Sequence, residues 1–224
     1  GLFRKYKVTL LPGHGKFAGR GDDHWQVDVN GEIVEAKHVI VATGSKARHL
    51  DGIPVDNKVI CDNAGALCFD KAPKRLGVIG AGVIGLELGS VWKRLGSEVT
   101  VLEALPDFLA AADQAVAREA WKVFTAKQGL NIQLGIKINK VTQSKKGVSI
   151  EYDSGDETKT LEVDKLIISV GRVPNTANLG VENVGLKLDD KGRVDVDGQC
   201  RTNLPNVWAV GDVIRGPMLA HKGM

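Results

Sequence analysis

A glycine-rich turn between a strand and a helix constrains this chain more than any other stretch. The run GVIGAGVIGLELG places Gly80, Gly82 and Gly85 in the pattern G-x-G-x-x-G, directly after the apolar segment RLGVI. In such a turn the first glycine allows a sharp change of direction. The second lets the backbone approach a pyrophosphate, and the third lets the helix pack closely on the strand. The pattern predicts a strand, this turn, a helix from about Val83 to Leu95 capped by Gly96, and a second strand, EVTVLE.

An acidic residue at the right spacing makes the turn more specific. Glu103 ends the strand EVTVLE, 18 residues after Gly85. A carboxylate there can accept hydrogen bonds from both hydroxyls of an adenine ribose, and it would repel a 2′-phosphate. The helix N-terminus adds free N–H groups and a partial positive charge for the pyrophosphate. A glycine turn that only packs a helix on a sheet is the alternative, but the acid favours a site for NAD over NADP.

Two further strand ends flank this motif. VIVATGS (Val39–Ser45) and NVWAVGD (Asn206–Asp212) each read as a buried strand that ends in a glycine and a polar group. Such an end brings backbone and a carboxylate to a phosphate or polyol chain at the carboxyl edge of a sheet. Taken singly, each stretch is equally well an ordinary turn at the end of a strand.

The remaining pattern is typical of an α/β protein. Alternating segments around Asn30-Gly31 predict a β-hairpin, and residues 46–73 read as an irregular connector. A second helix is expected from Asp113 to Gln128. The later expected elements are short strands broken at Lys146-Gly147 and at DSGD, the buried strand KLIISVG, a loop-rich stretch after GRVPN, and the opening turn of a helix over Pro217–Met224.

Composition excludes several classes of partner. The net charge is +3, lysines and arginines are interleaved with 27 acidic residues, and aromatic residues make up 5%, so we expect no nucleic-acid partner. No apolar run reaches the roughly 18 residues of a membrane span, so we expect no membrane partner. Cys61, Cys68 and Cys200 are an odd number without metal-ligand spacing. We therefore expect reduced, partly buried thiols, no metal site, and a reducing location, the cytoplasm or a compartment such as the mitochondrial matrix.

The order of these motifs carries a resemblance to a known family. The stretches GHGKF, VIVATGS, the glycine-turn unit through EVTVLE, SVGRVPNT, NVWAVGDV and PMLAHKG cover essentially the whole chain. Together they resemble the two-dinucleotide flavoprotein disulfide reductases, the class I pyridine nucleotide-disulfide oxidoreductases, and most closely the dihydrolipoamide dehydrogenases. The resemblance implies an α/β fold in which a Rossmann-like NAD-binding domain, a parallel sheet with a β-meander, is inserted into portions of an incomplete FAD-binding domain. The implied domains are a partial FAD domain with connector (1–73), the NAD domain (74–192) and a return segment (193–224).

The same resemblance implies an activity for a larger enzyme. In that family dihydrolipoamide reduces an enzyme disulfide, the thiolate passes electrons to FAD, and reduced FAD gives hydride to NAD⁺. The implied partners are lipoyl-bearing components of 2-oxo acid dehydrogenase complexes and a second copy in a homodimer. We expect this chain to be an internal fragment, because the family's C-x-x-x-x-C redox pair would precede Gly1 and its acid–base His and Glu would follow Met224. Cys61 and Cys68 do not have that spacing and His221 is not that histidine, so no catalytic residue is expected here and the isolated chain should be inactive.

The resemblance also assigns cofactor residues, position by position. Glu87 is assigned to the nicotinamide end, although a solvated acid in the first helical turn is an alternative. Gly15 and Ser45 are equally compatible with plain turn positions. The expected NAD residues are Gly80, Ala81, Gly82, Val83, Ile84, Gly85, Glu87, Glu103, Ile138 and Gly171. The expected FAD residues are Gly15, Thr43, Gly44, Ser45, Asp212, Met218, Leu219, Ala220 and His221.

Two other readings remain beside this one. The chain is also compatible with a fragment of another NAD(P)H-dependent flavoprotein disulfide reductase, such as a mercuric reductase. It is also compatible with a dinucleotide-binding module that has no turnover of its own.

Overall fold

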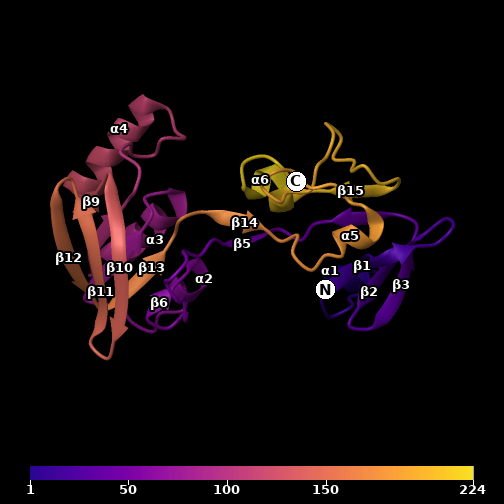
Figure 1. The fold of residues 1–224 in the computed structure, drawn as a ribbon, viewed down its shortest axis with the longest axis horizontal. Helices are drawn as coiled ribbons and strands as arrows, with labels where there is room; N and C mark the ends of the chain where they lie inside the picture. The colour runs from indigo at the N-terminus through magenta and orange to yellow at the C-terminus, as the bar shows by residue number, and fades with distance from the viewer. Residues whose placement is uncertain (224) are drawn as a thin grey trace. The chain divides into compact units, whose positions relative to one another are not determined.

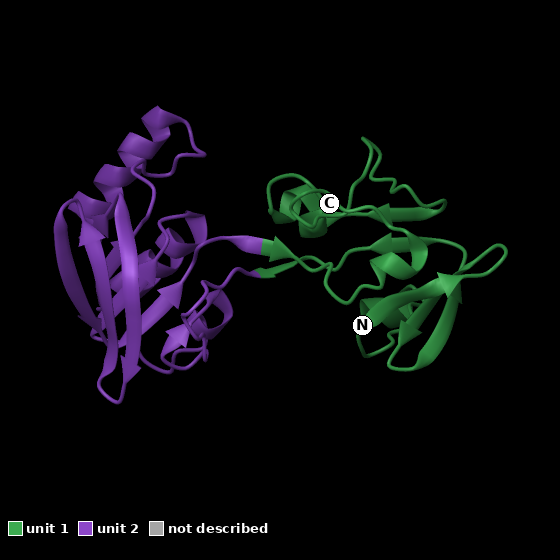
Figure 2. Cartoon of the chain, in the orientation of Figure 1, with its two compact units in different colours: residues 1–46, 173–224 green, residues 47–172 purple. Residues whose placement is uncertain are grey.

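The computed structural model describes residues 1–223 as two compact units. The central unit is Ala47–Arg172, and the outer unit combines residues 1–46 with the segment from Val173 on (Figure 2). The chain therefore enters and leaves the central unit once, between the two portions of the outer unit. The central unit begins at Ala47 because the connector packs with it, whereas the sequence placed domain boundaries after residues 73 and 192.

The central unit is built on a five-stranded parallel sheet with the order β6-β13-β7-β8-β9. Figure 1 labels β6, β13 and β9 of this sheet. Helix α3 (Val83–Arg94) connects β7 to β8, so these strands form a βαβ unit. The strands are β6 (Ile60–Cys61), β7 (Arg75–Ile79), β8 (Glu98–Leu102), β9 (Asn131–Gln133) and β13 (Lys165–Ile168). The Rossmann-like fold class predicted from the glycine turn is thus confirmed.

Alternate residues along the sheet face two different layers. Val78 and Val101 are fully buried on one face of the sheet, where Leu86 and Trp92 of α3 pack against them. The residues of the opposite face pack on an antiparallel meander of β10 (Ile136–Ser144), β11 (Gly147–Ser154) and β12 (Glu157–Val163). This second cluster includes Ile79, Leu102, Ile168, Val148 and Ile150. The period-two burial of a strand therefore produces a helix–sheet–meander sandwich, in agreement with the expected meander.

The second predicted helix is also present. Helix α4 (Gln114–Lys122) begins after Asp113, whose carboxylate accepts hydrogen bonds from the N–H groups of Ala115 and Val116. It continues into a π-helical turn, η1 (Val123–Lys127), before Gly129 ends it at a φ of 73°. The wider turn was not predicted, since a change from α to π leaves no signal in a pattern of apolar residues.

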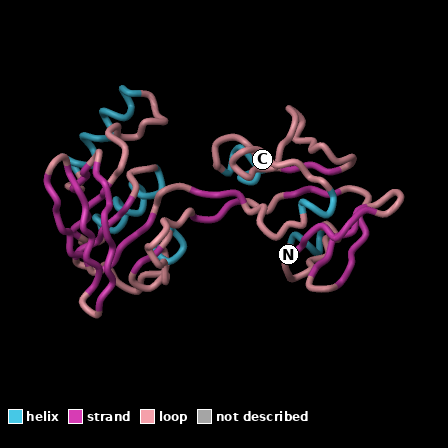
Figure 3. The backbone as a smooth tube through the Cα atoms, viewed as in Figure 1, coloured by secondary structure: helices cyan, strands magenta, loops and turns pink. Residues whose placement is uncertain are grey.

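The outer unit combines a small antiparallel sheet with a two-stranded parallel one. The predicted hairpin is present, with Asn30 and Gly31 both at positive φ between β2 and β3. Strands β4 and β15, from the two portions of the chain, pair in parallel. A loop-rich stretch between α5 and β15 confirms the irregular pattern after GRVPN (Figure 3). The elements not yet placed are α1 (Leu2–Lys5), β1 (Gly15–Arg20), β2 (Trp25–Val29), β3 (Glu32–Ala36), β4 (Val39–Val41), β5 (Ser45–Ala47), α2 (Asn63–Ala66), β14 (Arg172–Pro174), α5 (Val181–Val184), β15 (Val207–Ala209), η2 (Gly211–Val213) and α6 (Ala220–Gly223).

The cysteines, the length of the helices and the C-terminal segment were also subjects of prediction. Cys61, Cys68 and Cys200 are free, and burial raises the pKa of the Cys61 thiol to about 11, whereas Cys68 is exposed rather than partly buried. Within residues 1–223 no helix is long and apolar enough to cross a bilayer. The helix expected over Pro217–Met224 is present as α6, and Met224 lies outside the described residues.

Candidate functional site

Two of the three motif glycines cannot carry a side chain. Gly80 has a φ of +106°, and a Cβ built on it would lie 2.2 Å from the backbone oxygen of Ser169. A Cβ on Gly85 would lie 2.1 Å from the backbone oxygen of Gly80. The turn is therefore as tight as the motif predicts, because β7, β13 and α3 meet there with backbone against backbone.

Gly82 is different, because it faces open space. It is the N-cap of α3 with ordinary backbone angles (φ −72°, ψ 175°), and a Cβ there would meet nothing within 4 Å. Neither the backbone nor the packing of the described chain requires a glycine at this position. The opening lies at the N-terminus of a twelve-residue helix whose first turn contains no acidic side chain. Such a terminus is suited to hold an anion.

Glu103 is fixed at the carboxyl end of β8 through both its backbone and its carboxylate. Its Oε2 accepts a hydrogen bond of 2.6 Å from the N–H of Ala81, and its Oε1 accepts one of 2.9 Å from the N–H of Leu105. Its own carbonyl accepts the N–H of Ile136 at 3.0 Å. Each carboxylate oxygen keeps a second lone pair. The side chain is thus oriented next to the glycine turn and still able to accept.

One cleft of about 1080 Å³ collects these groups within the central unit. Of the ten residues expected to bind NAD, it is lined by Gly80, Gly82, Glu103, Ile138 and Gly171. The other five, Ala81, Val83, Ile84, Gly85 and Glu87, belong to the turn and to α3 but do not line it. Glu87 is exposed at the start of the second turn of α3 and does not line the cleft, so the alternative of a solvated acid near the helix start stays open.

A β-bulge shapes the far wall of this cleft. The register between β10 and β11 shifts between Ile138 and Lys140, and Ile138, Asn139 and Lys140 all line the cleft. The bulge interrupts the regular alternation of the strand in the middle of the stretch of β10 that lines the cleft. Asn139 is held there by a 2.7 Å hydrogen bond from its Nδ2 to Oδ1 of Asp153.

Sequence reasoning missed several cleft residues. They include Lys137, Asn139 and Lys140 on β10, and Arg48 and the segment Leu50–Ile53 of the connector. The connector carries no motif, and a bulge has no compositional signature in this stretch. Gly52 has a φ of 78° and turns the connector sharply at this wall of the cleft.

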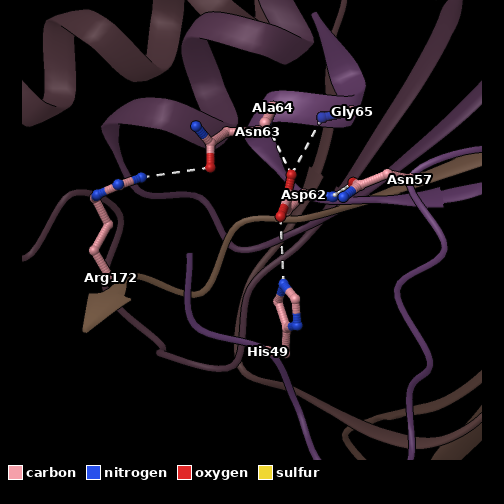
Figure 4. A network of polar contacts seen from close by, with 7 residues as sticks. All are labelled: His49, Asn57, Asp62, Asn63, Ala64, Gly65 and Arg172. Atoms are coloured by element: carbon pink, nitrogen blue, oxygen red, sulfur yellow. Dashed lines mark hydrogen bonds and ion pairs between the residues drawn. The ribbon is translucent and has the colours of Figure 1, made fainter. Parts of the chain in front are cut away.

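The connector is ordered by polar contacts rather than by a long element. Figure 4 shows Oδ1 of Asp62 accepting hydrogen bonds from the N–H groups of Ala64 and Gly65, at 2.9 and 3.2 Å, while Oδ2 faces Nε2 of His49 at 3.4 Å. Burial alone would raise the pKa of Asp62, but these hydrogen bonds outweigh it and hold the pKa below its usual value. Arg172, where the chain leaves the central unit, donates to Oδ1 of Asn63 at 3.4 Å. His49, near the first residue of the central unit, and Arg172, its last residue, thus both contact the start of the short helix α2.

Asp56 gives this connector a testable pH dependence. Its Oδ1 accepts the N–H groups of Lys58, Val59 and Ile60, and its Oδ2 accepts Nε2 of Gln143. Burial acts to raise the pKa of Asp56, but these hydrogen bonds prevail and lower it from 3.8 to about 2. A carboxyl group with a depressed pKa stabilises the fold above its unfolded pKa and loses that contribution as the pH falls toward its folded pKa.

We expect Asp56→Asn to lower the free energy of unfolding by about 1 kcal/mol at pH 6, after allowance for solvent screening. The difference from the unaltered chain should shrink between pH 4 and pH 2, measured by urea denaturation at each pH. Asp70→Asn changes an exposed carboxylate in the same connector and should not alter this profile. A constant difference between Asp56→Asn and the unaltered chain at pH 6 and pH 2.5 would contradict the assignment.

The residues expected to bind FAD lie in the outer unit. The Oγ of Ser45 donates to Oδ2 of Asp212 at 2.5 Å, so these two are together. Thr43 and Gly44 are both bonded to Asn175, through the Thr43 hydroxyl to the Asn175 carbonyl at 2.7 Å and through the Asn175 N–H to the Gly44 carbonyl at 2.9 Å. Because β4 and β15 are parallel, their carboxyl ends are adjacent, as the two flanking motifs predict.

The other expected FAD residues are less tightly grouped. Gly15 and Thr43 line a small apolar cavity of about 170 Å³. Met218, Leu219, Ala220 and His221 lie in and before α6, and three of the four are exposed. Helix α6 approaches η2, where a Cβ on Gly223 would lie 3.4 Å from the Cα of Gly211. This approach brings the segment near Asp212, the neighbour of Gly211 in η2.

Known proteins with similar sequences and structures support this architecture. A family model described as pyridine nucleotide-disulphide oxidoreductase matches residues 1–224. The chain is 64% identical to dihydrolipoyl dehydrogenase of Cupriavidus necator over 99% of this chain and 47% of that protein. It is 44% identical to dihydrolipoyl dehydrogenase 1, mitochondrial, of Arabidopsis thaliana over 99% of this chain and 44% of that protein.

A solved structure agrees with the sequence relatives. The Cu(II) complex of the HOCl-induced flavoprotein disulfide reductase RclA from Escherichia coli matches with a TM-score of 0.87 and 26% identity, over 99% of this chain and 50% of that chain. The chain spans about half the length of each of these proteins. Because the family model covers all the motifs described above, the chain belongs to the pyridine nucleotide-disulphide oxidoreductase family.

Proposed function

We propose that the cleft of the central unit binds NAD(H). The observation that carries this proposal is Gly82, which the chain does not need for its own packing but which leaves open space at the N-terminus of α3, in the same cleft as Glu103. A pyrophosphate would fit this opening, because helix N–H groups face it and no side chain fills it. Ala81, Val83, Ile84 and Gly85 would contribute as backbone of the turn and first helical turn around that group.

Glu103 would hold the adenine ribose of the same cofactor. Its oxygens keep lone pairs for two ribose hydroxyls while the N–H groups of Ala81 and Leu105 fix its orientation. The same negative charge would repel a 2′-phosphate, so NAD is favoured over NADP. Ile138 would place backbone beside the adenine, and Gly171, which lines the same cleft, would be another backbone position near the cofactor. Glu87, which does not line the cleft, is proposed for the nicotinamide end only through the family resemblance.

The outer unit would hold part of FAD. Asp212, positioned by Ser45 at 2.5 Å, is suited to accept a hydrogen bond from a polyol hydroxyl. Thr43 and Gly44 would supply backbone at the end of β4, together with Gly15, and residues 218–221 would supply N–H groups near the flavin ring. In this proposal residues 1–73 and 193–224 belong to the flavin domain and residues 74–192 to the NAD domain, although residues 47–73 pack in the central unit and residues 173–192 in the outer unit.

The activity we propose for the protein that contains this chain is oxidation of dihydrolipoamide by NAD⁺. Bound FAD and NAD⁺ supply the hydride chemistry, and the protein supplies binding, orientation and exclusion of water. Within this chain, the central unit orients the nicotinamide dinucleotide and the outer unit positions the flavin. The proposed partners are lipoyl-bearing components of 2-oxo acid dehydrogenase complexes and a second copy in a homodimer. A reducing compartment is the proposed location, and no group in this chain is assigned to the acid–base or disulfide chemistry.

Steady-state turnover of the full-length protein tests this activity. We expect it to reduce NAD⁺ with dihydrolipoamide, and to use NADP⁺ at least about 100-fold less efficiently, since a like charge beside the 2′-phosphate costs several kcal/mol. The 224-residue chain alone should show no turnover. Full-length protein that reduced glutathione disulfide or Hg²⁺ with NADPH, and left dihydrolipoamide unchanged, would favour another flavoprotein disulfide reductase instead.

A further inference from the structure

A second cavity in the central unit is separate from the dinucleotide cleft. It has a volume of about 510 Å³ and lies between the segment Asp107–Ala112 and helix α4. No residue lines both cavities. The volume falls within the range of small-molecule sites, roughly 300–1000 Å³. We refer to this cavity, lined among others by Phe108, Leu109, Ala117, Arg118, Trp121 and Leu134, as the aromatic pocket.

The walls of the aromatic pocket are suited to a flat apolar group. The rings of Phe108 and Trp121 are in edge-to-face contact, with centroids 5.1 Å apart and planes at 76°. Both side chains are only half-buried, although they pack at the border of the sheet core. Leu109 and Leu134 add aliphatic surface, and the buried Ala117 provides a small side chain where a larger one would fill the space. An aromatic guest would gain contact with two rings that are otherwise left open to water.

The polar rim of the pocket carries an excess of positive charge. Arg118 and Lys122 lie one turn apart on α4 and both line the pocket, opposite a single carboxylate, that of Asp107. Lys122 is already paired, with Oε2 of Glu119 at 3.4 Å. Among the interactions of residues 1–223, the guanidinium of Arg118 has no hydrogen bond or ion pair. Arginine is the side chain best suited to bind a carboxylate through two parallel N–H donors.

From this combination we propose that the aromatic pocket binds a small aromatic monocarboxylate. Its ring would pack on Phe108 and Trp121, and its carboxylate would face Arg118. A neutral apolar guest would use the rings but leave Arg118 unpaired, so the charge argument favours the acid. The proposal does not depend on nucleotide binding, because it concerns other residues.

The test uses 3-phenylpropionate as the probe and 3-phenyl-1-propanol as its neutral counterpart, each titrated into the 224-residue chain by NMR or calorimetry. We expect saturable binding of one acid per chain and weaker binding of the alcohol by up to about fivefold, as for one partly exposed ion pair. Arg118→Gln should weaken binding of the acid to the level of the alcohol and leave the alcohol unchanged. Arg94→Gln, on the exposed end of α3 and in neither cavity, is the matched control and should change neither affinity.

Four results would overturn the proposal. These are the absence of saturable binding by the folded chain, equal affinities for the acid and the alcohol, an unchanged acid affinity in Arg118→Gln, and competition with NADH. A repeat with saturating NADH identifies the site, because binding at the aromatic pocket should be unaffected, whereas competition would place the acid in the dinucleotide cleft. Failure of NADH itself to bind would contradict the proposed function and leave the phenylpropionate result independent of it.

Discussion

Gly82→Ala should weaken NADH binding by about 10- to 100-fold while leaving the fold as stable as before. The loss of binding follows from the open space at this position. A methyl group there would occupy the space in which the pyrophosphate must approach the backbone at the N-terminus of α3. The unchanged stability follows from the same geometry. The backbone angles suit alanine, and a Cβ meets nothing within 4 Å.

Two small effects on stability should nearly cancel in this variant. Alanine reduces the conformational freedom of the unfolded chain, which stabilises by about 0.4–1 kcal/mol. Alanine is also a poorer N-cap than glycine, which costs a similar amount. The net change in free energy of unfolding should therefore stay within about 1 kcal/mol, measured by urea denaturation beside calorimetric titration with NADH.

Gly85→Ala is the contrasting variant in the same motif. Its Cβ would lie 2.1 Å from the backbone oxygen of Gly80, so α3 must move away from β7. We expect a destabilisation of about 3 kcal/mol or more, with loss of NADH binding as a consequence of the distorted turn. If Gly82→Ala bound NADH normally, the turn would serve only to pack the helix, and the proposed phosphate site would be wrong.

Glu103→Arg should shift the preference between the two nicotinamide dinucleotides towards NADP(H). Removing the carboxylate eliminates the acceptor for the ribose hydroxyls, and the guanidinium would attract a 2′-phosphate instead. Replacing a like charge beside the 2′-phosphate with an opposite one changes the free energy of NADPH binding by several kcal/mol. The ratio of NADPH to NADH affinity should therefore rise about 100-fold or more. Titration of both cofactors into the variant and the unaltered chain measures this ratio.

The structure adds a stability effect to this substitution. The buried N–H of Ala81 donates to Glu103, and an arginine offers it no acceptor. We expect the free energy of unfolding to fall by about 1–3 kcal/mol, the cost of a buried donor left without a partner. Glu98→Arg, an exposed residue at the other end of β8, is the matched control for charge and should leave the affinity ratio nearly unchanged, although its place opposite Arg75 costs some stability. An unaltered affinity ratio in Glu103→Arg would remove the carboxylate from cofactor recognition.

The local parts of this fold were predictable because their signals are local. The glycine turn, the hairpin at Asn30-Gly31 and the helix capped by Asp113 each depend on backbone angles or caps that few residue types satisfy. The position of Glu103 followed from the spacing of one βαβ unit. In each case the residue type itself limits the available conformations.

The parts that were missed depend on partners distant in sequence. Ile60-Cys61 forms an edge strand only because β13 lies beside it more than 100 residues later. The bulge at Ile138–Lys140, in the wall of the cleft, depends on the register with β11. The contact between Glu103 and the N–H of Ala81 is likewise a feature of the folded turn, not of the motif.

Calorimetric titration of the unaltered 224-residue chain with NADH tests the central claim most directly. The proposed site lies wholly within the central unit, so the chain should bind one NADH, and bind NADPH at least about 100-fold more weakly. A folded chain that bound neither cofactor, or bound both equally, would contradict the roles assigned to Gly82 and Glu103.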